Sequence, residues 1–470
     1  MATPLLHVSR DRLEAALRSS IAPFALEVIA LLERAGCEAW CVGGFVRDIT
    51  LGHPSNDIDI ATNATWRDVA RICTAQGLRA SETGIKHGTV TIYDPARPEA
   101  VAEVTTYRAD GPSDDSRHPR EVRFVHTIEE DLARRDFTMN ALAYHPERGL
   151  LDCYGGLDDL RSGTIRCIGD PLQRFSEDAL RILRGCRFVA QLGFTIDPAT
   201  LQAMTVRKSL LALISKERIV HELDRLLTGP FVFDALMQTA GVLAFPLPEL
   251  AAMRNCRQDT KYHLYDVYEH TAHVVQETPP TRLARWAALC HDMGKPAASF
   301  YAADGVEHFY GHAHVSVVLA EGLLTRLGFN RPFIRDVLTL VELHDATIAP
   351  KRSSVAKAIA RLEGRADLFL ALCDLKIADA RAQTPKYGAV RIEMAQRLKE
   401  IARKLVDDEQ ALSVRDLAIG GHDLMDSGIP QGPQIGSVLK QLLDEVLDER
   451  VPNEQDALIE RACELSSQTQ

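Results

Sequence analysis

The chain has 470 residues, of which 46% are hydrophobic and 25% are charged, and its formal net charge is −11. This length exceeds what one hydrophobic core serves, so several domains are expected, and the composition excludes a disordered or fibrous protein. The acidic balance argues against a broad, sequence-blind nucleic-acid binder, so any RNA contact must come from local basic patches.

The N-terminal part of the chain is predicted to be mixed α/β. Residues 11–35 have the periodicity of an amphipathic helix, and a second helix is predicted near 65–76. Short strands are predicted at about 38–42, 56–61, 88–93 and 101–107. From Phe175 onward strand signals nearly vanish, and helices separated by Gly- and Pro-containing turns run to the end. The sequence therefore predicts an α+β multidomain protein with a small mixed sheet near its N-terminus and an all-α remainder.

Cysteine spacing and hydropathy bear on the compartment. The ten cysteines include no Cys-x-x-Cys pair, and the closest two are Cys37 and Cys41. This pattern favours free thiols in a reducing cytosol over disulfides or zinc. The N-terminus has no apolar signal-peptide core, and no stretch approaches about 18 uninterrupted apolar residues. We expect a cytoplasmic protein without a membrane segment.

The first chemical pattern is Gly43-Gly44 followed by Asp57-x-Asp59. Residues two apart on a strand face the same side, so both carboxylates reach one cation while the residue between them turns into a core. Such oxygens suit Mg²⁺, and a Gly-Gly turn lets backbone N–H groups approach a triphosphate. Glu103, on an alternating β-branched segment, is a third candidate carboxylate on a neighbouring strand. Each piece alone is commoner as a solvated strand edge or a plain turn, but together they favour metal-assisted phosphoryl or nucleotidyl transfer.

Two arginine-rich segments follow. Arg134, Arg135, Asp136 and Asn140 lie at an expected helix start, where the arginines bind phosphate bidentately and the acid and amide hold a sugar or orient the arginines. An internal ion pair at a helix N-terminus is the alternative. Asp178 and Arg181 are three apart and hence neighbours on an expected helix face. Such a pair can accept C and A but reject U and G, because each mismatched buried group costs about 1–3 kcal/mol. A solvated, salt-bridged face would have the same spacing.

Four motifs stand in a fixed order between about residues 38 and 230. They are Val42-Gly43-Gly44-x-x-Arg47-Asp48, Asp57-Ile58-Asp59-Ile60-Ala61-Thr62, Arg134-Arg135-Asp136-Phe137-Thr138-Met139-Asn140-Ala141 and Glu177-Asp178-x-x-Arg181-x-x-Arg184. Together they resemble the class II tRNA nucleotidyltransferases, the CCA-adding enzymes and their poly(A) polymerase relatives. The resemblance implies a nucleotidyltransferase-fold head and template-independent addition of C, C and A to the 3′ end of tRNA. CTP and ATP would be the substrates, and the chemistry would be two-metal nucleotidyl transfer with Mg²⁺.

The resemblance also implies a role for individual residues. Asp57 and Asp59 would hold the catalytic metals, with Glu103 as the third acid. Contacts to the incoming nucleotide are implied for Gly43, Gly44, Arg47, Arg135, Asp136 and Asn140. A protein template for base choice is implied for Asp178 and Arg181, with Arg184 and Arg187 in support.

Two neighbouring segments refine the resemblance. Gly84-Ile85-Lys86-His87-Gly88-Thr89-Val90 is similar to the tRNA nucleotidyltransferase branch, whereas residues 110–119 contain no aromatic residue of the kind that this family tends to carry there. That loop helps to switch from C to A addition, so a CC-adding, A-adding or poly(A) polymerase variant stays an alternative. A remote alternative is a protein-modifying nucleotidyltransferase regulator with an HD domain; such chains are longer and lack the Asp178 and Arg181 helix.

Histidine is concentrated in the second half of the chain. Eight of the sixteen histidines fall within residues 263–344. A resemblance to the HD phosphohydrolase pattern is carried by His270, His291, Asp292 and Asp379, with His312 and His344 as further ligands for a second ion. It implies a transition metal (Ni²⁺, Co²⁺, Mn²⁺ or Zn²⁺) and an accessory phosphatase or phosphodiesterase activity at RNA ends. A structural remnant is the alternative.

Five domains are predicted along the chain. They are a catalytic head (1–150), neck helices with the base-selecting pair (151–205), a helical RNA-binding body (206–258), an HD phosphohydrolase domain (259–390) and a helical tRNA-binding tail (391–470). The expected partners are tRNA, CTP and ATP, and no membrane. The sequence predicts no oligomeric state.

Overall fold

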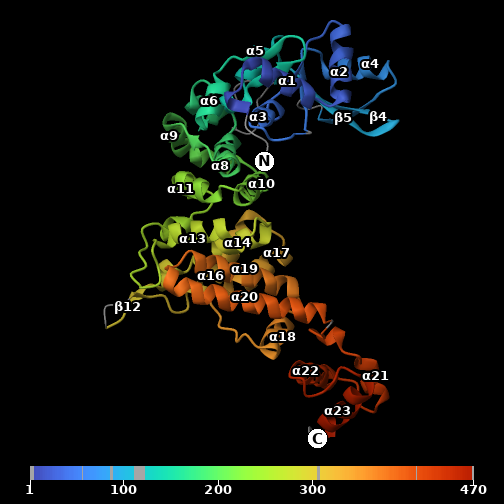
Figure 1. Cartoon of the computed structure of the whole chain (residues 1–470), viewed down its shortest axis with the longest axis vertical. Coiled ribbons are helices and arrows are strands. Elements are labelled where there is room, and N and C mark those ends of the chain that lie inside the picture. Colours follow the sequence, from blue (N-terminus) through green and yellow to red (C-terminus); the bar gives the residue numbers. More distant parts are fainter. Residues whose placement is uncertain are drawn as a thin grey trace. The chain divides into compact units, whose positions relative to one another are not determined.

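The computed structural model of the chain describes residues 5–55, 57–84, 88–110, 122–303, 307–408 and 410–467. The chain divides into two units, Met1–Pro246 and Leu247–Gln470, which are described separately (Figure 1). The first unit combines a mixed sheet with helices, and the described part of the second consists of helices and one short hairpin. The predicted α+β class, with the sheet near the N-terminus and helices after it, is confirmed.

Seven strands form the sheet of the first unit, in the order β3-β4-β5-β2-β1-β8-β9. Their bounds are β1 Ala39–Val42, β2 Asp59–Thr62, β3 Arg79–Gly84, β4 Thr89–Asp94, β5 Arg97–Thr106, β8 Leu142–His145 and β9 Gly149–Asp152. β2 runs parallel to β5, and the other neighbouring pairs are antiparallel. The predicted strands correspond to β1, β2, β4 and β5. The sequence does not predict β3, β8 or β9. β3 is polar and β8 is buried throughout, so neither alternates, and β9 has only four residues.

The single helix predicted over 11–35 is wrong, because two helices occupy this segment. α1 spans Arg10–Ser20 and α2 spans Pro23–Arg34, and their axes differ by 99°. Pro23 lacks a backbone N–H and restricts the residue before it to extended geometry, so the first helix cannot continue through it. Proline is favoured at the first position of a helix, and there it starts α2.

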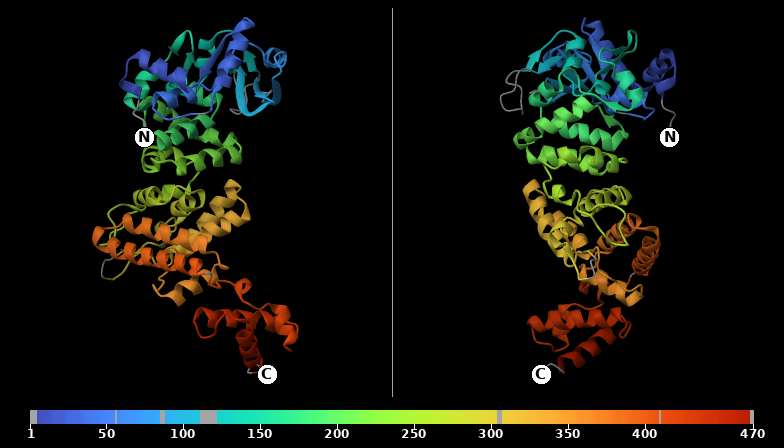
Figure 2. Two further views of the ribbon diagram at one scale, coloured as in Figure 1. Left: turned by 45° about the vertical axis from the view of Figure 1, so that its right-hand side comes forward. Right: turned by 90° about the vertical axis from the view of Figure 1, so that its left-hand side faces the viewer.

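Short helices and two small strand pairs complete the first unit. The helices are α3 Gly44–Thr50, α4 Trp66–Thr74, α5 Ile128–Ala133, η3 Thr138–Asn140, α6 Gly156–Ser162, α7 Pro171–Glu177, α8 Leu180–Leu192, α9 Pro198–Arg207, η4 Lys208–Leu213, α10 Lys216–Leu227 and α11 Val232–Leu243. The strand pairs are β6 Arg108–Asp110 with β7 Val122–Phe124 and β10 Thr164–Ile165 with β11 Thr195–Ile196. α2 and α4 pack on the sheet, and α8 packs against α10 and α11 (Figure 2).

The second unit is built from helices α12 to α23. Their bounds are α12 Glu249–Met253, α13 Val267–Glu277, α14 Arg282–Cys290, α15 Lys295–Ala298, α16 His312–Leu327, α17 Arg331–Leu343, α18 Arg352–Arg361, α19 Ala366–Arg381, α20 Pro385–Asp407, α21 Gly421–Asp426, α22 Pro433–Leu447 and α23 Gln455–Ser467. A hairpin of β12 Phe300–Tyr301 and β13 Glu307–His308 lies between α15 and α16 in the sequence. Helices α18 through α23 share one buried apolar cluster, which includes Phe369, Leu405 and Leu442.

Two expectations drawn from composition can be compared with the structure. All ten cysteines lie among the described residues and are free thiols, six of them buried. Within the described ranges no single helix has the length and apolar character to cross a membrane, although the bent pair of α1 and α2 passes that test by length and composition.

Candidate active site

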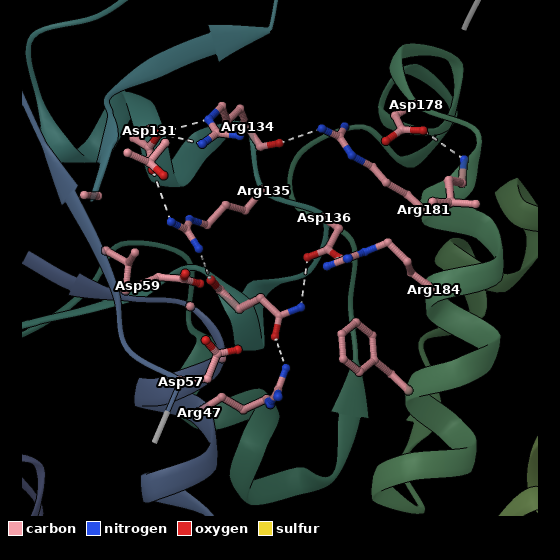
Figure 3. A pocket seen from close by; sticks show the side chains of 18 of the residues that line it. Arg47, Asp57, Asp59, Asp131, Arg134, Arg135, Asp136, Asp178, Arg181 and Arg184 are labelled. Atoms are coloured by element: carbon pink, nitrogen blue, oxygen red, sulfur yellow. Dashed lines mark hydrogen bonds and ion pairs between the residues drawn. The ribbon is translucent and has the colours of Figure 1, made fainter. Parts of the chain in front are cut away.

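Three carboxylates meet at the edge where β2 and β5 run side by side. Asp57 precedes β2 and Asp59 begins it, while Ile58 and Ile60 are buried, as the alternation predicts. Asp59 is the register partner of Glu103 on β5. All three acids line a cavity of about 670 Å³ in the first unit. Figure 3 labels Asp57 and Asp59 in this cavity. The sheet therefore brings together the three acids that the sequence singles out.

The electrostatics of these acids favour a bound cation. Burial and the neighbouring Asp57 raise the pKa of Asp59 to about 6, with a smaller contribution from Glu103, while Arg135 opposes the shift. A carboxylate whose pKa is raised by neighbouring negative charges is stabilised when a divalent ion binds and neutralises it. Mg²⁺ takes oxygen ligands from one or two carboxylates, so the donor set fits it.

Gly43 supplies the turn between β1 and α3. Its φ is +71°, a left-handed value that favours glycine, and its N–H donates to the carbonyl of Leu142 at 3.0 Å. A Cβ at this position would lie 2.6 Å from Nη1 of Arg135. The missing side chain thus lets a guanidinium approach the backbone beside the acids, and both Gly43 and Gly44 line the cavity.

The helix start predicted at Arg134–Asn140 is wrong. α5 ends at Ala133, Phe137 is extended, and only Thr138–Asn140 forms a short 3₁₀ turn. The side chain of Asp136 accepts a hydrogen bond from the N–H of Phe137 at 2.8 Å, a local bond that competes with helix formation.

Asp131 is a residue of this site that the sequence argument does not identify. It is buried on α5 and accepts hydrogen bonds from Arg134 at 2.9 Å and Arg135 at 3.3 Å. Its spacing of three and four residues before two arginines is the signal that would have identified it. Because Asp131 orients both guanidinium groups, it helps to form the cationic wall of the cavity.

A hydrogen-bond chain runs from α8 to α3 through the buried Asp136. Asp136 accepts from Arg184 at 2.7 Å and from Asn140 at 2.9 Å, and Asn140 accepts from Arg47 at 2.6 Å. Burial raises the pKa of Asp136, but the Arg184 guanidinium and the Asn140 amide outweigh it and hold the pKa well below its usual value. Asp136 is therefore ionised at neutral pH and fixes two arginines of the cavity wall.

Asp178 and Arg181 both line the cavity, but the expectation that they share one helix face is wrong. α7 ends before Asp178, which has extended geometry, and α8 begins at Leu180. Asp178 accepts from the N–H of Leu180 at 3.0 Å, so the side chain caps its own backbone instead of continuing the helix. Arg218 lies 3.6 Å from the other oxygen of Asp178.

Arg181 is held by a different acid. Its guanidinium donates to Glu177 at 3.1 Å and to the carbonyl of Arg134 at 2.8 Å.

Arg187 is buried and pairs with the equally buried Glu222 on α10 at 3.1 Å. Burial lowers the pKa of Arg187 to about 10. Sequence spacing gives no indication of Glu222, because this residue is far from Arg187 along the chain.

Phe188 is a third group of this site, after Asp131 and Glu222, that the sequence patterns do not indicate. The guanidinium carbons of Arg47, Arg184 and Arg187 lie 5.2, 5.6 and 4.5 Å from its ring centroid. The ring lines the cavity and attracts cations through its face. The only sequence signal is its place one residue after Arg187 on the arginine-rich helix.

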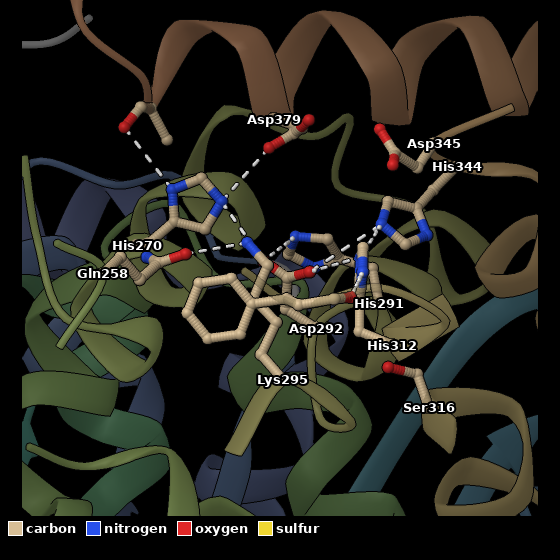
Figure 4. Close-up of polar contacts among 12 residues, drawn as sticks. Gln258, His270, His291, Asp292, Lys295, His312, Ser316, His344, Asp345 and Asp379 are labelled. Carbon is tan, nitrogen blue, oxygen red and sulfur yellow. Dashed lines mark hydrogen bonds and ion pairs between the residues drawn. The ribbon is translucent and has the colours of Figure 1, made fainter. Parts of the chain in front are cut away.

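A second cluster of candidate ligands lies in the second unit (Figure 4). The residues that converge there are His270 on α13, His291 and Asp292 after α14, His312 on α16, His344 after α17 and Asp379 on α19. They include two ligand groups that share Asp292, one with His270 and His291 and the other with His312 and His344. Asp379 lies 3.1 Å from Nε2 of His270.

The histidines of this cluster are oriented as metal ligands usually are. Nδ1 of His291 donates to the carbonyl of Ala288 at 2.7 Å, and the corresponding atoms of His312 and His344 meet backbone carbonyls at 2.9 and 2.6 Å. A protonated, bonded Nδ1 leaves Nε2 with a lone pair for a metal. Burial lowers the pKa of His344 to about 3, so this ring is neutral. The geometry fits a metal-binding group.

Cationic residues border the same cluster. Lys295 lies 2.7 Å from Asp292 and also donates to Gln258 at 2.7 Å. Arg391 on α20 lies 3.2 Å from Asp379 and 3.4 Å from Asp345. The HD pattern gives no indication of Arg391, which only the packing of α20 on α19 brings there.

Two parts of the motif evidence lie outside the described residues. Residues 85–87 belong to the segment Gly84–Val90, and residues 111–121 include most of the loop without an aromatic residue.

Three family models match the chain. The poly(A) polymerase head domain matches residues 39–166, an RNA- and SrmB-binding site of polymerase A matches 193–254, and tRNA nucleotidyltransferase domain 2 matches 320–462. The head-domain match covers the sheet and its three acids, so the fold and this site define a nucleotidyltransferase.

Curated relatives extend the match over most of the chain. The CCA-adding enzyme of Levilactobacillus brevis is 33% identical over 93% of this chain and 96% of the relative. The CCA-adding enzyme of Geobacillus stearothermophilus is 41% identical over 57% of this chain and 63% of the relative. The chain belongs to the CCA-adding enzyme family and is a tRNA nucleotidyltransferase.

Solved structures agree with this assignment. The Bacillus stearothermophilus CCA-adding enzyme in complex with CTP is 28% identical and has a TM-score of 0.71, covering 96% of this chain and 99% of that chain. The Thermotoga maritima CCA-adding enzyme complexed with tRNA is 19% identical, with a TM-score of 0.57, and supports the fold alone.

Proposed function

We propose that this protein adds C, C and A to the 3′ end of tRNA from CTP and ATP without a nucleic-acid template. One observation carries the proposal: a single cavity joins the acids Asp57, Asp59 and Glu103 to the candidate base-selecting residues Asp178 and Arg181. The CTP complex of the Bacillus stearothermophilus relative supports CTP as a substrate.

The three acids would hold Mg²⁺ at a two-metal site, with Asp57 and Asp59 as ligands and Glu103 as the third acid. Bound there, Mg²⁺ supplies charge neutralisation for the attacking and leaving oxygens. The tRNA 3′-hydroxyl attacks the α-phosphorus in line, and pyrophosphate leaves. The backbone at Gly43 and Gly44 lets the triphosphate approach closely, and Arg47 and Arg135 bind its oxygens.

Base choice would come from side chains that recognise base edges. Asp178 accepts from the exocyclic amino group of cytosine or adenine, and Arg181 donates to the adjacent ring nitrogen. Uracil and guanine place a carbonyl where the amino group should be, which leaves buried polar groups unpaired at about 1–3 kcal/mol each. Arg184 and Arg187 would support this pair from α8, which also carries Arg181. Asp136 and Asn140 would position the sugar.

We further propose a functional division of the chain. Residues 1–150 would form the head, 151–205 the neck, 206–258 an RNA-binding body, 259–390 the HD domain and 391–470 a tRNA-binding tail. The division into units after Pro246 and the family-model bounds support a head followed by helical regions. The boundary at 390 falls within α20, so the tail and the preceding helices share an element.

The test uses tRNA transcripts that end before C74, after C74, after C75 and after A76, with Mg²⁺ and each labelled nucleoside triphosphate. Ordered addition of two C and one A, without U or G, would support the proposal. Loss in Asp57→Ala, with activity retained in the exposed control Asp158→Ala, would assign the chemistry to this site. Addition of C alone, of A alone or of a long A tail would assign a CC-adding, A-adding or poly(A) polymerase function. No incorporation on any RNA would direct attention to protein substrates.

A second activity is proposed for the cluster around Asp292, which would bind one or two transition-metal ions (Ni²⁺, Co²⁺, Mn²⁺ or Zn²⁺). The converging, oriented histidines favour it. Hydrolysis of a phosphomonoester or a 2′,3′-cyclic phosphate at an RNA end would complement end repair. Phosphate release with added Ni²⁺, Co²⁺ or Mn²⁺ that is lost in His291→Ala, but not in the exposed control His314→Ala, supports the proposal. Activity that His291→Ala leaves unchanged would contradict it.

A further inference from the structure

Three aromatic rings, together named the stack, contact one another on and beside the β12–β13 hairpin, which lies at the periphery of the second unit (Figure 1). The ring centroids of His308 and Tyr310 are 5.0 Å apart with an interplanar angle of 18°. The Phe300 ring is tilted against both, at 5.7 Å and 31° from His308 and at 5.6 Å and 48° from Tyr310. Phe300 is 43% exposed and Tyr310 is 74% exposed. A contiguous exposed apolar patch is a feature of interaction sites, and here two exposed rings are in contact.

The stack borders the cluster around Asp292. His308 and Tyr310 line a cavity of about 570 Å³ together with Asp292, His312 and His344. His308 and Tyr310 therefore face the same cavity as the candidate metal ligands, and Phe300 contacts both rings from outside its lining.

The hairpin is fixed relative to those ligands. Glu307 is buried on β13 and accepts from the N–H of Asp259 at 3.0 Å and the hydroxyl of Ser299 at 2.6 Å. The carbonyl of Phe309 accepts from Nδ1 of His312 at 2.9 Å. Phe309, which precedes Tyr310 in the chain, thus links the exposed ring to a histidine of the cluster through its backbone.

The cavity also contains cationic side chains suited to phosphate. Lys261, Lys295 and Arg391 line it, and Lys261 lies 5.3 Å from the ring of Tyr262 and 5.6 Å from that of Tyr387. Flat exposed rings beside cations suit nucleotides whose bases are not already stacked in a helix, because every base has a π-face that an aromatic ring can cover. Unpaired RNA ends are recognised in this way, whereas a duplex presents its backbone.

We propose that Phe300, His308 and Tyr310 form a stacking platform for unpaired nucleotides at an RNA 3′ end, which places the terminal phosphate at the cluster around Asp292. This inference rests on the proposed phosphohydrolase activity, and it names single-stranded RNA ends, not small phosphate esters, as the substrate class.

The first test is photocrosslinking of the full-length protein to a single-stranded RNA that carries 4-thiouridine at its last nucleotide and a 3′-phosphate. Excess CTP and ATP occupy the nucleotide site of the first unit. We expect a crosslink within residues 299–312 that falls about tenfold in Tyr310→Ala and in Phe300→Ala, the loss of one stacked base. Tyr301→Ala is the matched control, because Tyr301 is exposed on the same hairpin outside the stack. Crosslinks confined to other peptides, or equal in all three variants, would overturn the platform.

Kinetics separate the platform from the activity on which it rests. The ratio of kcat/KM for an RNA 3′-phosphate to kcat/KM for p-nitrophenyl phosphate should fall about tenfold in Tyr310→Ala through KM, and should not change in Tyr301→Ala. An unchanged ratio with both substrates hydrolysed refutes the platform and leaves the phosphohydrolase intact. If the wild-type protein hydrolyses neither substrate with Ni²⁺, Co²⁺ or Mn²⁺, the phosphohydrolase proposal fails, and the crosslinking result alone decides whether the rings bind RNA.

Discussion

Replacement of Asp59 by Asn should abolish nucleotide addition and stabilise the metal-free first unit. The reason is that Asp57, Asp59 and Glu103 concentrate negative charge in one cavity, where the pKa of Asp59 rises from 3.8 to about 6. A shift of this size corresponds to at most about 3 kcal/mol. Because Asp59 faces the open cavity, solvent screening reduces this to about 1 kcal/mol. For a unit of this size the expected rise in Tm is about 2–4 °C.

The pH dependence has a definite sign. Above pH 6 the folded wild-type protein carries the full cost of ionising Asp59, so Asp59→Asn has its full advantage in stability there. The advantage should decline as pH falls from about 6 to 3.8, and vanish where Asp59 is protonated in both the folded and the unfolded states. Asp57→Asn should raise the Tm for the same reason, because it removes a neighbouring negative charge.

The assay is differential scanning calorimetry at several pH values, in chelator and then with Mg²⁺. Mg²⁺ should raise the Tm of the wild-type protein and leave that of Asp59→Asn unchanged. Asp158→Asn, on the exposed surface of α6, is the control and should change stability little. A Tm of Asp59→Asn in chelator at pH 7.5 that equals or falls below the wild-type value would refute the reasoning.

Three further substitutions test other parts of the structure. Glu222→Ala should lower the free energy of unfolding by about 3–5 kcal/mol in urea titrations, because it leaves the buried Arg187 without its partner; a loss below about 1 kcal/mol would show that water replaces Glu222. Gly294→Ala should abolish transition-metal binding measured by calorimetry while nucleotide addition persists, because its Cβ would collide with the backbone of His312; undiminished binding would contradict this. Gly43→Ala, at φ +71°, should lower kcat/KM for CTP at least tenfold, since strain of about 1–2 kcal/mol distorts the turn; wild-type kinetics would show that the turn tolerates a side chain.

Local chemistry is the part of this protein that the sequence predicts well. The alternation around Asp57 and Asp59 requires only a strand with one buried face, and the structure has it. The Gly43 turn is similarly local, because a left-handed φ is a property of one residue. The ordered histidines and acids of the second unit are recognisable because each motif lies at or near a helix end, where the backbone orients it.

Helix breaks and long-range partners are the parts that local patterns miss. Spacing alone suggests one helix through Asp178 and Arg181, yet the Asp178 side chain bonds its own backbone and ends α7. Spacing also favours a helix start at Arg134. In the structure α5 has already ended at Ala133, and the buried Asp131 of that helix pairs with Arg134 and Arg135. In the first case a side chain bonds a backbone N–H, and in the second a side chain forms ion pairs with the arginines. Helical periodicity describes only the spacing of residues, so it does not predict such side-chain interactions.

By itself the sequence determined which groups can act: three acids, a glycine turn, an arginine-rich helix and a set of imidazoles. Only the tertiary structure decided which of them meet. The parallel register of β2 and β5 brings Glu103 beside Asp59, and α10 supplies Glu222 to Arg187. The packing of α20 on α19 brings Arg391 to Asp379. These contacts depend on strand pairing and helix packing between distant segments, and local residue patterns do not specify them.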